Sequence, residues 1–258
     1  MKIALVLMGM LVLNSTNVLA KENAKTTLKT EEKSADPVQL AQHKPPALSQ
    51  STPVGTGANT VKTIRHKKKK KKKPVFLEPG VLATTIIVDG KPFVVGRNQD
   101  RKNLMPKIYQ KTGRGIIKPL HPFKPHLVET IAELEMINYM KRISAGDTST
   151  IVVDARAPIW LNLTGTLPGA VHVSYKQFLD KKEALDILQD EFGVRVRPNG
   201  TLDFSRAKTL AIYCNGNWCK MSPTLIRELL KYNYPAEKIK YYRGGMQAWT
   251  LLGLPTVN

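Results

Sequence analysis

The stretch 209–223 constrains the fold more than any other part of the chain, because it places a cysteine between a strand and a helix. An apolar, β-prone run at 210–213 ends at Cys214, and small and polar residues follow. Ser222 is a good N-cap and Pro223 is favoured at a first helical position, so we expect a helix over 223–232. Its N-terminus and the loop amides would both stabilise a thiolate. The pattern therefore predicts a reactive cysteine.

Segments typical of strands and helices alternate through the second half of the chain. Strands are expected at residues 150–154, 171–174, 209–213 and 239–242, and helices at 128–143, 175–192, 223–232 and 246–252. Such alternation predicts a parallel α/β sheet with helices on both faces. Sites in such sheets lie at the carboxyl ends of strands, where Asp154, Cys214 and Arg243 are expected.

The first 75 residues have a different composition. Residues 1–20 combine a positive residue, an apolar run and the small Ala20, which is typical of a signal peptide, so we expect export, most simply to a bacterial periplasm. Residues 21–75 hold 14 Lys and Arg against 4 Asp and Glu, with few large apolar side chains, which predicts a disordered Lys-rich linker. The run Lys67 to Lys73 is either a solvated spacer or a contact with an anionic surface; nucleic acid is disfavoured because no aromatic residues interleave the lysines.

An N-terminal extension is expected at residues 76–127, ahead of an α/β domain at 128–258. Within it, Asp89-Gly90 joins two β-prone runs, which predicts a hairpin with a two-residue turn. The extension is interpreted either as a small separate unit or as an elaboration of the domain.

The chain has only two cysteines, Cys214 and Cys219. A disulfide scaffold would need more of them, spread along the chain. The five histidines show no metal-ligand spacing, so neither a metal nor a cofactor is expected.

Five short motifs follow the order and approximate spacing of a known family. They are Asp154-x-Arg156, the GTLPGA run from Gly165 to Ala170, Tyr213-Cys214, the run from Tyr242 to Trp249 with its paired glycines, and Gly253-Leu254-Pro255. The region from about Val128 to Val257 resembles a rhodanese-like domain. The resemblance implies a parallel five-stranded sheet flanked by helices. It also implies a sulfurtransferase whose catalytic cysteine, Cys214, carries a persulfide from a sulfane-sulfur donor to a thiol or other thiophilic acceptor.

The loop after Cys214 would form the substrate-binding part of the site. The residues expected to contribute are Asn215, Gly216, Asn217, Trp218, Cys219 and Lys220. Lys220 would hold an anionic donor, and Trp218 is either a lid over the sulfur or a hydrophobic anchor. Asp154 and Arg156 are expected to hold the fold, with Arg156 paired to an acidic group. Arg243 either faces the pocket or is a surface charge, and Gly244 and Gly245 would leave room for close packing.

Three interpretations of Cys219 stay open: it resolves a persulfide on Cys214, it forms a reversible disulfide with Cys214, or it is a bystander. Two alternative functions follow, a periplasmic thiol–disulfide redox protein or sensor, and a non-catalytic binding module. A phosphatase is disfavoured, because the loop contains no arginine to bind phosphoryl oxygens.

Overall fold

The computed structural model describes residues 73–258. The predicted signal peptide, nearly all of the Lys-rich linker and the lysine run before Lys73 lie outside the described residues. Within the described part of the chain, no helix is long and apolar enough to cross a membrane.

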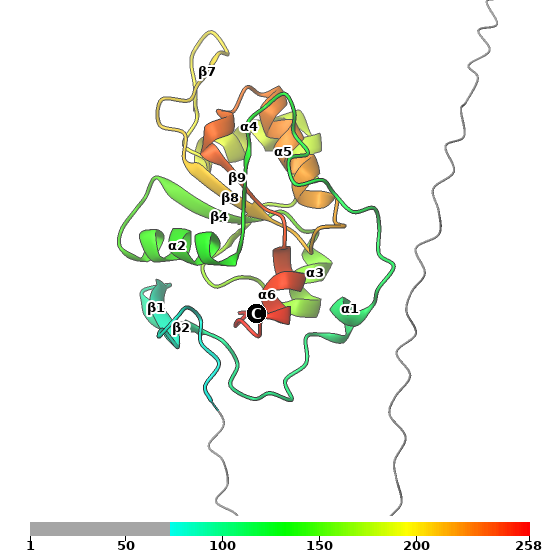
Figure 1. Ribbon diagram of the computed structural model, residues 1–258. Helices are drawn as coiled ribbons and strands as arrows, with labels where there is room; N and C mark the ends of the chain where they lie inside the picture. The colour runs from blue at the N-terminus through cyan, green and yellow to red at the C-terminus, as the bar shows by residue number, and fades with distance from the viewer. Residues whose placement is uncertain (1–72) are drawn as a thin grey trace, which may run out of the picture. The chain divides into compact units, whose positions relative to one another are not determined.

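A central sheet of five parallel strands confirms the predicted α/β architecture (Figure 1). The strands are β3 (Glu129–Ile131), β4 (Thr150–Asp154), β5 (Val171–His172), β8 (Thr209–Tyr213) and β9 (Ile239–Tyr242), in the order β3-β9-β8-β4-β5. β8 lies at the centre, and its neighbours β4 and β9 pair with it along nearly its whole length. Cys214 therefore emerges from the middle of the sheet at its carboxyl edge, where parallel sheets carry their sites.

Helices cover both faces of this sheet, because side chains along each strand alternate between the faces. They are α2 (Glu133–Ser144), α3 (Pro158–Thr164), α4 (Lys181–Asp190), α5 (Met221–Lys231) and α6 (Gly245–Leu251), with short 3₁₀ turns η1 (Gln177–Leu179) and η2 (Ala236–Lys238). Ile212 and Tyr241 pack with α4 and α5 on one face. Tyr213 and Tyr242 pack with α2 and α6 on the other. Both faces are thus apolar and buried.

The N-terminal extension packs on the domain as an elaboration of it. The predicted hairpin is present as β1 (Ala83–Val88) and β2 (Lys91–Gly96), turning at Asp89 and Gly90 with φ of 49° and 73°. Ile86 and Val95 join the core on the α2 side of the sheet. A short helix, α1 (Lys107–Gln110), follows, and the chain then runs along the domain to β3 (Figure 1). The segment between the hairpin and β3 therefore contains one helical turn.

Several predicted boundaries are wrong. The helix expected from residue 128 begins at Glu133, because β3 pairs with β9 first. The helix expected over 175–192 divides into η1 and α4, since Asp180 caps α4 by accepting from the backbone N–H of Lys182 and Glu183. A small hairpin, β6 (Arg195–Val196) with β7 (Leu202–Asp203), was not predicted.

Candidate active site in the two-cysteine loop

The loop between β8 and α5 is held against the start of α6. The backbone N–H of Met246 donates to the Cys214 carbonyl and that of Gln247 donates to the Asn215 carbonyl, both at 2.9 Å. Gly245, with φ of 56°, lets these backbones approach closely. The prediction that this glycine gives room for packing agrees with that contact, and the packing fixes where the loop begins.

Cys214 is buried at the base of the loop, with 2% of its surface exposed. The Ser222 hydroxyl donates to its Sγ at 2.9 Å. Ser222 was predicted as the helix N-cap, and this is wrong: α5 begins at Met221, after Lys220, and the hydroxyl is engaged with the thiol instead. A hydroxyl that donates a hydrogen bond stabilises a thiolate, so Ser222 favours the nucleophilic thiolate form of Cys214.

Cys219 folds back onto Cys214. Its backbone N–H donates to the Gly216 carbonyl at 2.9 Å, which closes a tight turn. Both thiols are free, both are buried, and they pack together with Met221. A hydrogen bond from the Cys214 thiol lowers the pKa of Cys219 to about 7, and hydrogen bonds from the backbone amides of Met221 and Asn215 lower it further. Burial, and then the neighbouring Cys219, raise the pKa of Cys214. The pair thus shares one proton, held mainly on Cys214.

A buried ion pair lies at the carboxyl end of β4, where Asp154 pairs in register with Tyr213, the residue before Cys214. Arg156 donates to Asp154 through Nε and Nη2, at 2.8 and 2.6 Å, and neither side chain is exposed. The hydroxyls of Tyr213 and Thr166 donate to the second carboxylate oxygen at 2.9 and 2.8 Å. Arg156 also donates to the Thr164 hydroxyl at 2.7 Å. These residues therefore hold the fold, with Arg156 paired to an acid as the sequence suggested.

The N-terminal extension reaches the loop through Tyr109. The Tyr109 hydroxyl donates to Asn215 Oδ1 at 2.7 Å, and its carbonyl accepts from Gln247 Nε2 at 3.0 Å. Gln247 Oε1 in turn accepts from Trp218 Nε1 at 2.7 Å. Trp218 packs against the cysteine cluster and is fixed at its far end, so it acts as an anchored cover.

Residues 114–118 form a strap across the loop. The Lys118 N–H donates to the Asn217 carbonyl at 2.8 Å. The Arg243 guanidinium donates twice to the Lys118 carbonyl, at 3.1 and 2.7 Å, so Arg243 holds the strap instead of facing a pocket or lying free on the surface. The guanidinium carbon of Arg114 lies over the Trp218 ring, 5.0 Å from the ring centroid. The side chains packed directly on the two cysteines and Met221 are those of Ala157, Trp160, Tyr175 and Trp218, and the strap lies against Asn217 and Trp218.

Replacing Gly115 with Ala is expected to open the strap. Gly115 has φ of 49°, and an added Cβ would lie 2.9 Å from the Trp218 carbonyl oxygen. We expect alkylation of the two cysteines to become about tenfold faster, as a local loss of ~1.4 kcal/mol would produce. The matched control is Gly113→Ala, which has φ of 70° and nothing within 4 Å. Equal rates in the two variants would show that the strap does not limit access.

The structure brings most of the predicted site together. Cys214, Asn215, Gly216 and Cys219 are buried side by side in the loop, whereas Lys220 is exposed at its rim. Sequence reasoning missed the contacts made by four residues: Tyr109, Arg114, Ser222 and Gln247. Only Ser222 had a sequence signal, its place directly after the cysteine loop. No group of three or more His, Cys, Asp or Glu among residues 73–258 could hold a metal ion.

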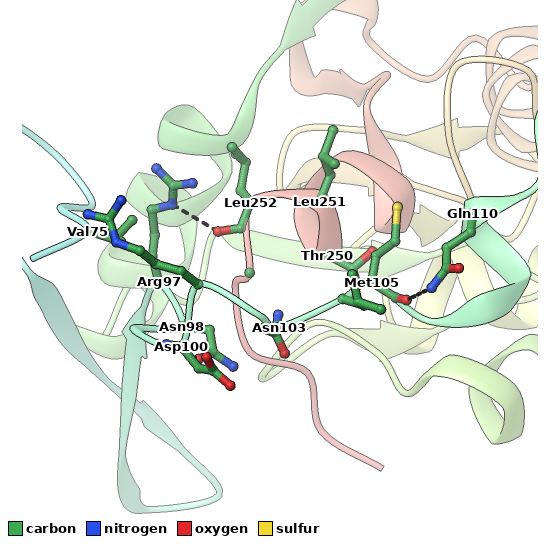
Figure 2. A pocket seen from close by; sticks show the side chains of 13 residues that line it. Val75, Arg97, Asn98, Asp100, Asn103, Met105, Gln110, Thr250, Leu251 and Leu252 are labelled. Atoms are coloured by element: carbon green, nitrogen blue, oxygen red, sulfur yellow. Dashed lines mark hydrogen bonds between the residues drawn. The ribbon is translucent and has the colours of Figure 1, made fainter. Parts of the chain in front are cut away.

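A separate cavity of about 530 Å³ lies between the segment after β2 and the end of α6 (Figure 2). Arg97 Nε donates across it to the Leu252 carbonyl at 2.9 Å, and Gln110 Nε2 donates to the Met105 carbonyl at 2.7 Å. Neither cysteine lines it. The first bond joins the extension to the residue that follows α6, whereas the second lies within the extension.

Comparison with known proteins finds a family model that covers this loop. The family model described as the rhodanese-like domain matches residues 137–252. A search of curated proteins found no match. Similar solved structures include a protein of unknown function from Rhodopseudomonas palustris, described as a possible tyrosine phosphatase (19% identity, 50% of this chain and 85% of that one, TM-score 0.34). Others are a single-domain sulfurtransferase from Saccharomyces cerevisiae (16%, 51% and 95%, 0.34) and a rhodanese-related protein from Thermoplasma volcanium (18%, 50% and 97%, 0.30).

Proposed function

Because residues 137–252 form a rhodanese-like domain, we propose that the protein is a sulfurtransferase whose Cys214 carries a persulfide. The donor is a small sulfane-sulfur anion, and the acceptor is a thiol or another thiophile. The observation that supports this most directly is the Ser222 hydroxyl at 2.9 Å from Cys214 Sγ. It gives the first cysteine of the loop a hydrogen-bond donor suited to a thiolate.

The reaction requires Cys214 as a thiolate. The proton that the pair shares moves from Cys214 to Cys219, and the Cys214 thiolate attacks the outer sulfur of the donor. A new S–S bond forms, and the S–S bond of the donor breaks; with thiosulfate, sulfite leaves with the electron pair. The persulfide then passes its outer sulfur to the acceptor. Ser222 and the loop amides would stabilise the negative charge on sulfur throughout.

The surroundings of the loop suit an anionic donor. Lys220 lies at the rim, and Arg114 and Arg243 lie in or against the strap. The Asn215 side-chain nitrogen is buried, and it has no hydrogen-bond partner among the described residues. It could therefore donate a hydrogen bond to an incoming anion.

The test is incubation of the full chain with thiosulfate, followed by intact-mass measurement. We expect an adduct of about 32 Da, one sulfur atom, that is absent from Cys214→Ala. Since the adduct can be short-lived, samples are quenched in acid at several times. Cys214→Ser is the second variant, and its far-ultraviolet circular dichroism establishes that it is folded. Absence of any adduct with thiosulfate and with inorganic polysulfide would contradict the proposal.

The place of action is also a proposal. Export to a bacterial periplasm depends on residues 1–20, and contact with an anionic surface depends on Lys67 to Lys73. Cell fractionation of the full chain, with and without residues 1–20, tests the first. A non-catalytic binding module predicts that a Cys214→Ser chain still functions in cells.

A further inference from the structure

Accepting a proton is the one role that Cys219 has had so far, and the loop holds its thiol directly against Cys214. The turn from Gly216 to Cys219 is closed by a 2.9 Å hydrogen bond, and it points the second thiol back onto the first. Cys219 is 3% exposed, and it packs with Cys214 and Met221. A thiol placed only by accident in a surface loop would be expected in solvent, where it could not meet Cys214.

The cover over the loop favours a partner inside the protein. Trp218 is tied to Gln247, and the strap is tied to Asn217 and Arg243. Because Cys214 is 2% exposed, a large acceptor thiol can reach it only if the surrounding side chains move, whereas Cys219 is already packed against it. The nearest acceptor for sulfur chemistry on Cys214 is therefore Cys219.

The charges around Cys219 suit it as a nucleophile. The hydrogen bond from the Cys214 thiol is the main cause that lowers the pKa of Cys219 to about 7. The backbone amides of Met221 and Asn215 and the charge of Arg156 lower it further, and these groups stay in place when Cys214 takes up sulfur. The other groups that face the pair, Ser222 and Tyr241, are neutral near that pH, and burial raises the pKa of Tyr241. The two amides and Arg156 thus still favour a Cys219 thiolate once Cys214 has taken up sulfur.

We propose that Cys219 is the resolving thiol, which attacks Cys214 Sγ of the persulfide and releases the outer sulfur as hydrosulfide. This inference rests on the proposed function. The S–S bond between Cys214 and its outer sulfur breaks, and the Cys214–Cys219 disulfide forms. The Cys219 proton leaves with the hydrosulfide. Two electrons pass from the two cysteines to the outer sulfur, and an external dithiol then reduces the disulfide by exchange.

The experiment compares the reduced full chain with Cys219→Ser. After addition of thiosulfate or inorganic polysulfide, samples are quenched in acid and alkylated. Their intact masses are then measured, and free sulfide is assayed. In the parent chain we expect a transient adduct, then a disulfide between the two cysteines and one sulfide per chain. In Cys219→Ser the adduct should last at least about tenfold longer, with no sulfide until an external thiol is added.

The outcomes separate the two proposals. A parent adduct as long-lived as that of Cys219→Ser, with both thiols of unreacted chains still open to alkylation, overturns the resolving role and leaves sulfur transfer standing. Sulfur uptake by Cys214→Ser but not by Cys219→Ser reverses the roles and overturns both assignments. No uptake by any variant overturns the proposed function and this inference together. Because the adduct itself is the readout in Cys219→Ser, its formation also shows that the variant is folded.

Discussion

Replacing Arg156 with Met is expected to destabilise the domain by about 3–5 kcal/mol, because it leaves the Asp154 carboxylate buried without its cation. Both side chains are completely buried, and Arg156 donates to both carboxylate oxygens of Asp154 as well as to the Thr164 hydroxyl and the Gly165 carbonyl. The substitution keeps much of the side-chain length, so the lost charge dominates the effect. The free energy of unfolding is measured by urea denaturation.

An ion pair on the surface provides the matched control. Arg197 pairs with Asp203 at 3.2 Å, and its side chain is 60% exposed. We expect Arg197→Met to cost less than about 1 kcal/mol, because water replaces the lost partner. A loss in Arg156→Met no larger than in this control would show that Asp154 is not held as a buried charge. Adding Asp154→Asn to Arg156→Met should recover part of the stability, since it removes the unpaired charge.

The architecture of the domain could be predicted because its signals are local. Apolar runs marked β4, β8 and β9, and helical periodicity marked α5 and α6. The short edge strand β3 and the 3₁₀ turn η1 had no such signal. β3 forms because β9 has a free edge with which residues 129–131 can pair, and the sequence of a three-residue segment gives no signal for a pairing of this kind.

Half of the site could be predicted for the same reason. Cys214 lies at a recognisable strand end, and the loop up to Cys219 follows it directly. The contacts of Tyr109 and Arg114 with that loop could not be predicted, because more than a hundred residues separate them from it. The contact of Ser222 was missed for another reason: a serine near a helix start fits an N-cap and a thiol partner equally well, and only the position of the helix start separates the two.

Replacing Gly245 with Ala is expected to slow sulfur uptake by about a hundredfold, because it moves the cysteine loop off its support. Gly245 has φ of 56°, and an added Cβ would overlap the Cys214 carbonyl oxygen and lie 2.8 Å from the Gly216 nitrogen. The neighbours are backbone atoms, so they cannot rotate away. The start of the loop and α6 must therefore separate, and we expect Cys214 to shift relative to Ser222.

Strain alone would not have this effect, and the chain offers a control that isolates it. Gly200 has φ of 79°, and nothing lies within 4 Å of an added Cβ. Gly200→Ala should cost about 1 kcal/mol of stability and leave sulfur uptake unchanged. Uptake is measured as the rate of adduct formation, beside urea unfolding of the same samples. If Gly245→Ala is destabilised but takes up sulfur at the parent rate, the contact between the cysteine loop and α6 stabilises the fold and does not position Cys214.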